Sequence, residues 1–160
     1  MGAVTGPTYP PTPPVPPQPP VPPYPPAGPP VTGSAAWWLG LLTLLCAPVV
    51  SNAIAAGAVL VYRSSVRARL EPTAAEVVRR AVNWQLSQLA YTVVLLLVHV
   101  VLVLVVARDE PQGFFPIGVV ILLVPVLGIY GLVLSVRSAI RADRGLLTPT
   151  PGAIPFLLPR

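Results

Sequence analysis

Residues 81–107 read AVNWQLSQLAYTVVLLLVHVVLVLVVA, a run without a single charged side chain. A helix that rises about 1.5 Å per residue needs roughly 20 apolar residues to cross a hydrocarbon core of about 30 Å. Two further charge-free apolar runs, residues 35–62 and 111–136, are as long. The three runs predict an all-α integral membrane protein with three transmembrane helices.

The composition supports the bilayer as the solvent of this chain. Of its 160 residues, 54% are hydrophobic and 9% are charged, whereas soluble domains are charged at about 25% of positions. The net charge is +5 and every basic residue is an arginine beside an apolar run, where it faces anionic headgroups or reports orientation. We therefore expect a lipid bilayer and no nucleic acid as partner. The single cysteine, Cys46, excludes an internal disulfide and a multi-cysteine zinc site.

The N-terminal tail, residues 1–34, has a different composition. It carries no charge and holds fifteen of the 24 prolines, many in six consecutive X-Pro-Pro triplets over residues 9–26. Proline lacks the amide donor and favours the polyproline II helix of three residues per turn, so we expect a disordered, semi-rigid rod. Tyr9 and Tyr24 fall at the two ends of one edge of this rod. The tail is either a docking arm for a polyproline-binding partner or a low-complexity spacer.

The remaining residues, 35–158, form the predicted membrane domain. Its first run, residues 35–62, is long for one crossing and short for two, and Pro48 lies in its middle. We expect one tilted, kinked helix here, and a re-entrant hairpin is the alternative. Around the second run, we expect an amphipathic helix over residues 74–85 that leads into a span over residues 86–107, with Trp84 at headgroup level.

The third predicted span covers residues 114–136, and Gly145 ends its helix. Arginines number zero in the tail, five in the first loop, one in the second loop and four from residue 137 onward. The positive-inside rule then predicts a cytoplasmic first loop and C-terminus, with the tail and residues 108–113 outside. A re-entrant first run would place the tail in the cytoplasm instead.

A polar stripe follows the second span. At 100° per residue, Gln85, Gln88, Thr92 and His99 lie on one face. Amides and imidazole in hydrocarbon are costly unless they are hydrogen-bonded, so the stripe should face another helix or a hydrated crevice. Asn52 in the first span is a plausible partner. His99 is either a neutral imidazole bonded to another helix or a protonation switch.

No residue pattern predicts a reaction. The predicted spans contain no carboxylate, and the sequence shows no phosphate-binding glycine loop, metal-ligand cluster or nucleophile with a base at a recognisable spacing. We expect no enzyme activity, no cofactor and no metal.

Two short motifs resemble a known family. Residues 80–86, RAVNWQL, resemble the Ala-Leu-Asn-Phe-Gln signature that opens the second span in small bacterial membrane proteins with a domain of unknown function. That group is similar to the twenty-kilodalton Tic subunit of the chloroplast inner-envelope translocon. Residues 140–145, followed by Pro151, resemble its closing pattern, although the usual first-span histidine is absent and Trp84 replaces phenylalanine. The resemblance implies one membrane domain with an interfacial Asn83 and Gln85, and no agreed activity.

Three functions are consistent with these features. The first is a non-enzymatic scaffold or accessory subunit of the bacterial cytoplasmic membrane that associates with itself or with other membrane proteins. The second is a subunit of a transport or protein-translocation complex, in which Gln88, Thr92 and His99 line a hydrated seam. The third is an adaptor that recruits a partner through its X-Pro-Pro tail.

Overall fold

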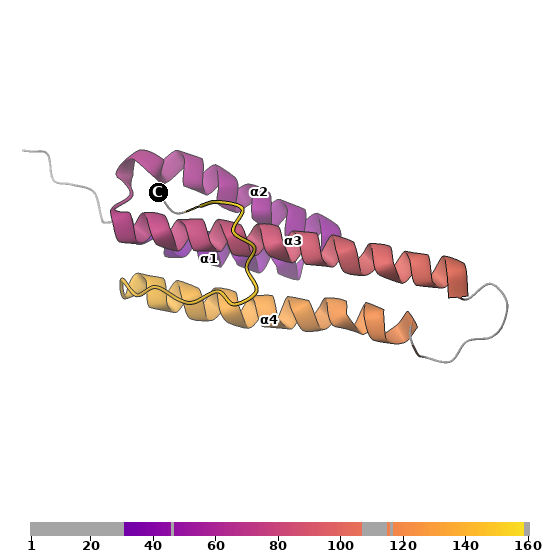
Figure 1. Cartoon of the computed structure of the whole chain (residues 1–160). Coiled ribbons are helices and arrows are strands. Elements are labelled where there is room, and N and C mark those ends of the chain that lie inside the picture. The colour runs from indigo at the N-terminus through magenta and orange to yellow at the C-terminus, as the bar shows by residue number, and fades with distance from the viewer. Residues whose placement is uncertain (1–30, 46, 107–114, 116, 159–160) are drawn as a thin grey trace, which may run out of the picture. The chain divides into compact units, whose positions relative to one another are not determined.

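The computed structural model describes residues 31–45, 47–106, 115 and 117–158. Their regular elements are helical, which confirms the all-α fold (Figure 1). In chain order they are α1 (Ser34–Trp38), the 3₁₀ helix η1 (Leu39–Leu44), α2 (Pro48–Val66), the 3₁₀ turn η2 (Arg67–Arg69), α3 (Pro72–Val106) and α4 (Ile117–Asp143). Within these described residues, three helical stretches are long and apolar enough to span a membrane: Pro48–Arg69, Pro72–Val105 and Ile117–Asp143. The chain is a multi-pass membrane protein.

The first apolar run does not form the single kinked helix that we expected over residues 35–62. Leu45 and Ala47 are extended, with ψ values of 142° and 104°, and α2 starts afresh at Pro48. Proline fits the first turn of a helix, where its missing amide costs nothing, and it disfavours a helical conformation for the residue before it. The Ser51 hydroxyl donates to the carbonyls of Leu45 and Ala47 at the turn.

The two halves of this run lie side by side as a helical hairpin. Figure 1 shows α1 behind α3, pointing along the bundle in one direction, and α2 returning in the other. The start of α1 therefore lies beside the start of α3, where Gly33 packs against the carbonyl of Ala74. Residues 31–34, which the sequence analysis assigned to the tail, belong to the bundle.

The amphipathic lead-in and the second span are one continuous helix, α3. It begins at Pro72, two residues before the predicted start, and the amide of Ala75 donates to the carbonyl of Glu71 at 2.8 Å. Its apolar side faces protein: Val78, Val82 and Trp84 are buried. The indole of Trp84 packs edge-on against Tyr130, with ring centroids 5.3 Å apart. Trp84 is therefore a core residue, and its position at headgroup level stays a prediction.

The last helix, α4, continues past residue 136, where the predicted span ends, and stops at Asp143. The predicted stop at Gly145 is therefore confirmed to within two residues. Gly145 adopts a left-handed conformation with φ of 69°. Its amide donates to the carbonyl of Ala142, and the amide of Leu146 donates to that of Arg141, both at 2.9 Å. Only glycine takes this φ without steric cost, and it lets the chain reverse along the bundle.

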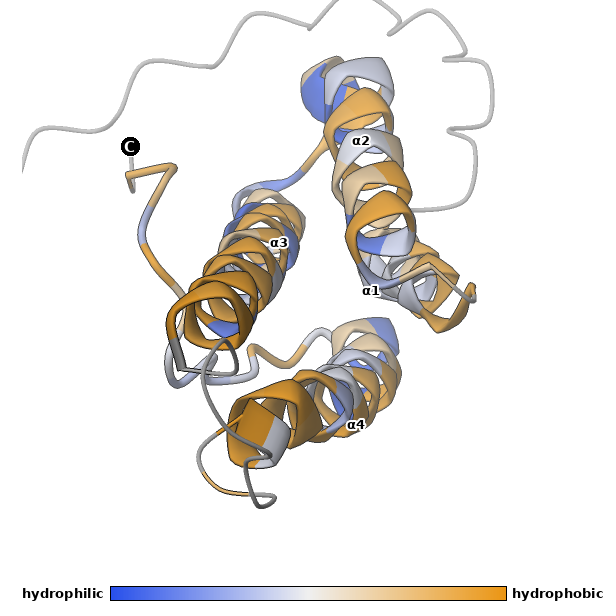
Figure 2. Ribbon diagram, turned by 90° about the vertical axis from the view of Figure 1, so that its right-hand side faces the viewer, coloured by the Kyte–Doolittle hydropathy of each residue, from blue (hydrophilic) through white to orange (hydrophobic). Residues whose placement is uncertain are grey.

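Tight packing is concentrated at one end of the bundle, which we call the arginine end because the last turns of α2 and α4 carry Arg63 and Arg141 there. The apolar core lies at this end and includes Trp37, Val59, Val78 and Ala139. Towards the other end, Leu97, Val101 and most other apolar side chains of α3 and α4 are exposed. Figure 2 shows the hydrophobic colour along most of the ribbons of α3 and α4. These faces are suited to lipid or to a neighbouring helix.

Candidate functional site

A polar seam lies between α2, α3 and α4. Gln85, Gln88 and Thr92 on α3 are buried, with at most 2% of their surfaces exposed. The side-chain amide of Asn52 on α2 donates to the Thr92 hydroxyl at 3.1 Å and to the carbonyl of Pro48 at 2.7 Å. The Thr92 hydroxyl donates to the carbonyl of Gln88 at 2.8 Å. The bond between Asn52 and Thr92 joins α2 to α3 in the apolar bilayer, where an unpaired amide would be costly.

Glycines make room for the two glutamines of the seam. A Cβ at Gly131 of α4 would lie 2.6 Å from both terminal atoms of the Gln88 side chain. A Cβ at Gly40 of η1 would collide with the Gln85 amide nitrogen and lie 3.0 Å from the Ser135 hydroxyl. Small residues of this kind let helix backbones approach closely in membranes. The glutamines thus fill the space that the glycines leave.

Several buried polar atoms of the seam have no hydrogen-bond partner among the described residues. Among the described residues, neither terminal atom of Gln85 has a hydrogen-bond partner, and the same is true of the side-chain oxygens of Gln88 and Asn52. Buried polar atoms are nearly always satisfied in proteins, and each unsatisfied one costs about 1 to 3 kcal/mol. The seam is therefore polar in character and could accept a further hydrogen-bonding group.

His99 is separate from the seam. It lies two turns beyond Thr92 on α3 and is half-buried. No described residue hydrogen-bonds with its buried Nδ1 atom. The structure thus brings Asn52, Gln85, Gln88 and Thr92 together and leaves His99 apart.

A second polar face of α3 binds the C-terminal segment, residues 146–158. Asn83 pairs with Leu157 in both directions: it accepts from the Leu157 amide at 2.8 Å and donates to the Leu157 carbonyl at 3.1 Å. One turn on, the Ser87 hydroxyl accepts from the Ile154 amide at 2.7 Å. A further turn on, the Tyr91 hydroxyl donates to the Gly152 carbonyl at 2.6 Å. The spacing of four residues aligns the three side chains along one face of the helix.

Two arginines extend this contact towards the start of α3. Glu76 accepts from Arg79 at 2.6 and 2.7 Å and from Arg80 at 2.7 Å. With their other nitrogens, Arg79 donates to the Leu157 carbonyl at 2.8 Å and Arg80 to the Thr148 carbonyl at 2.7 Å. Glu76 therefore orients both guanidinium groups towards the C-terminal segment, which Figure 1 shows crossing α3.

Sequence reasoning missed this C-terminal docking site. It treated Asn83 as an interfacial residue and gave Ser87 no role. The available signal was the four-residue spacing of Asn83, Ser87 and Tyr91 beside the seam stripe. Tyr9 and Tyr24, the candidate peptide-docking residues, lie outside the described residues.

The described residues contain no group of three or more His, Cys, Asp or Glu side chains placed to hold a metal ion. No curated protein and no solved structure matches the chain. The model of one family, described as the magnetosome magnetite crystal formation protein family, matches residues 32–157. This match supports a family of small bacterial membrane proteins and does not extend to the Tic subunit. By the extent of the match, the chain belongs to this family, MamF/MmsF.

Proposed function

We propose that the protein is a non-enzymatic accessory protein of the bacterial cytoplasmic membrane, a scaffold that associates with copies of itself or with other membrane proteins. The observation that supports this proposal is that its polar side chains bind other parts of the same chain. Asn52 and Thr92 join two of its helices, and Asn83 and Ser87 hold its own C-terminal segment. The outer faces of α3 and α4 remain apolar and exposed, as expected of surfaces that meet lipid or another helix.

The family description concerns the formation of magnetite crystals in magnetosomes. On the basis of this description, we propose that the chain acts in the membrane of such a magnetosome assembly. The proposal does not include contact with a mineral, because the described residues offer no clustered metal ligands. Glu76, a carboxylate that could otherwise bind cations, is already bound by Arg79 and Arg80.

Copurification in a mild detergent tests the proposal. We expect the tagged protein to bring down copies of itself or other membrane proteins in fixed ratio, while an unrelated three-span protein with the same tag does not. A monomer without partners would contradict the scaffold. A translocase or transporter as the stoichiometric partner, or solute flux through liposomes that hold only this protein, would favour the transport alternative. The unused capacity of Gln85 and Gln88 is the feature that supports that alternative.

We also infer that residue 31 joins the bundle on the side of the first loop and the C-terminus. The Thr32 hydroxyl lies 3.4 Å from a carboxylate oxygen of Asp143, at the end of α4, and Gly33 contacts Ala74 at the start of α3. Under the positive-inside rule this side is cytoplasmic. The inference replaces the outward tail that a single crossing of residues 35–62 would require.

Labelling of single cysteines tests this orientation. In a Cys46→Ala background, intact cells are treated with a membrane-impermeant maleimide. We expect Gln112→Cys to react in intact cells, and Thr5→Cys and Ala68→Cys to react only after permeabilisation, because they precede the hairpin and follow α2. Labelling of Thr5→Cys in intact cells, with Ala68→Cys protected, would show that the first run crosses the membrane once.

A further inference from the structure

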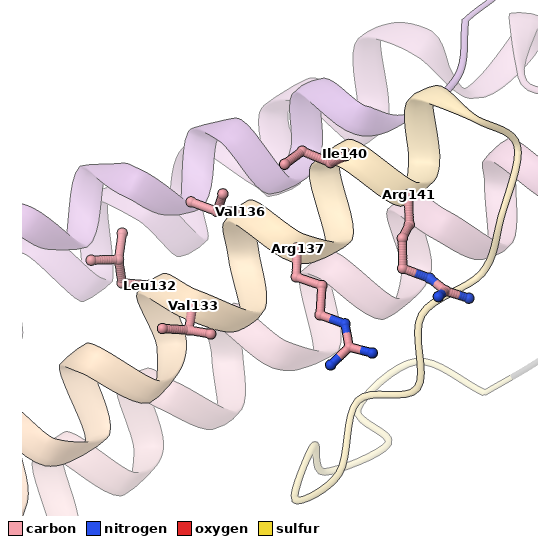
Figure 3. Close-up of a pocket in the computed structure, with 6 residues that line it drawn as sticks. All are labelled: Leu132, Val133, Val136, Arg137, Ile140 and Arg141. Atoms are coloured by element: carbon pink, nitrogen blue, oxygen red, sulfur yellow. The ribbon is translucent and has the colours of Figure 1, made fainter.

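We propose that α4 carries a binding groove for one anionic phospholipid, with the phosphate at Arg137 and Arg141 and an acyl chain along the apolar residues before them. Figure 3 shows the side chains that line this groove, a shallow and open hollow on one helix with a volume of about 560 Å³. It is lined by Leu132, Val133, Val136, Arg137, Ile140 and Arg141. The proposal rests on the membrane-spanning fold and is independent of the function proposed above.

The two arginines offer free donors to a phosphate. They are four residues apart, and Figure 3 shows both side chains extending from the same side of α4. Neither forms an ion pair within the described part of the chain, and Arg137 makes no hydrogen bond there. Arg141 donates through one Nη atom to the Leu147 carbonyl at 3.1 Å, and its buried Nε has no partner among the described residues. Guanidinium groups bind phosphate through charge-assisted hydrogen bonds.

The apolar part of the groove precedes the arginines and would hold the part of an acyl chain nearest the headgroup. From Leu132 to Arg137 the helix rises by about 7.5 Å at about 1.5 Å per residue, which is about half of one leaflet of a hydrocarbon core of about 30 Å. Arginines at the end of a span lie at the headgroup level, so the apolar residues before them lie in the hydrocarbon. A free anion would not use these residues. A phospholipid would use both parts.

A second arginine-lined cavity, of about 370 Å³, lies between the end of α2 and the start of α3. It is less suited to a phospholipid for two reasons. Its lining includes Glu76, which already binds Arg79. Its apolar lining residues include Leu70, Pro72 and Ala75, which lie after α2 and in the first turn of α3, so the cavity does not follow the apolar part of a span.

Native mass spectrometry of the full chain in detergent tests the proposal, with dioleoyl phosphatidylglycerol and dioleoyl phosphatidylcholine as probes. We expect the protein to retain one phosphatidylglycerol in preference to phosphatidylcholine. Arg137→Gln should weaken phosphatidylglycerol binding about fivefold, since each basic residue at a membrane surface contributes to the attraction of anionic lipid. Arg137→Lys should keep most of the affinity. Because Arg137 makes no hydrogen bond within the described residues, its replacement should leave the fold intact.

The double variant Arg67→Gln/Arg69→Gln is the control, because it removes positive charge from η2, away from the groove. We expect it to bind phosphatidylglycerol like the unmodified protein. Equal retention of the two lipids, or an equal loss in the control and in Arg137→Gln, would overturn the proposal. Displacement of the lipid by millimolar glycerol 3-phosphate would show that the groove recognises the headgroup alone and would overturn the acyl-chain part.

Discussion

Replacing Gly131 with leucine is expected to lower the free energy of unfolding by about 3 kcal/mol. Even a Cβ at this position would lie 2.6 Å from the end of the Gln88 side chain, which is buried, so a leucine requires Gln88 to shift inside the packed seam. Over-packing of this kind forces side chains off their preferred rotamers or separates the helices. Unfolding of the detergent-solubilised protein by increasing SDS, followed by tryptophan fluorescence, measures the effect.

Gly128 provides a matched control one turn earlier on the same helix. A Cβ there would meet no atom within 4 Å. Gly128→Leu introduces the same side chain and the same gain in helix propensity, so we expect it to change the free energy of unfolding by no more than about 0.5 kcal/mol. Equal destabilisation by the two leucines would show that the contact between Gly131 and Gln88 does not hold α4 against α3.

Replacing Asn83 with leucine is expected to release the C-terminal segment from α3 at a cost of about 2 kcal/mol. The change removes both hydrogen bonds to Leu157, and it leaves the Leu157 amide without its partner. Hydrogen–deuterium exchange of residues 146–158 measures the release directly. We expect faster exchange in that segment and unchanged exchange in the second half of α3.

Two further variants separate the pair interaction from a general loss of packing. Asn83→Asp keeps an acceptor for the Leu157 amide, and Arg79 still donates to the Leu157 carbonyl, so exchange should rise less than in Asn83→Leu. Ser87→Ala removes only the bond from the Ile154 amide and should affect exchange around that residue. If Asn83→Leu leaves the exchange of residues 146–158 unchanged, Asn83 does not hold the segment against α3.

Several elements of the fold could be predicted because their causes are local. Long apolar runs without charge are sufficient to indicate membrane helices, and glycine in a left-handed conformation is sufficient to end α4 at Gly145. The helical hairpin of residues 34–66 was harder to predict. Pro48 is compatible both with a kink and with a new helix start, and the choice depends on whether α1 can pack against α3 and α4.

The candidate site, too, has one part that could be predicted from the sequence and one part that could not. The spacing of Gln85, Gln88 and Thr92 defined one face of α3, so their common burial could be foreseen. The spacing of Asn83, Ser87 and Tyr91 marks a second face, but the partner of Asn83 could not be foreseen, because Leu157 is 74 residues away and binds through its backbone. A backbone partner leaves no side-chain pattern in the sequence. The burial of Trp84 could not be foreseen for a related reason: it depends on contact with Tyr130 from another helix.

The C-terminal segment offers mainly hydrogen-bond acceptors, and the surface that binds it offers mainly donors. Pro149, Pro151 and Pro155 supply carbonyl oxygens but no amide donors, so the segment is rich in acceptors. The bundle meets it mainly with donors: guanidinium, phenol and side-chain amide groups bind the carbonyls of Leu147, Thr148, Pro151, Gly152 and Leu157. Since these bonds end on the main chain, they constrain the donors on α3 more than the side chains of the segment, of which Ala153 and Leu157 pack against the core.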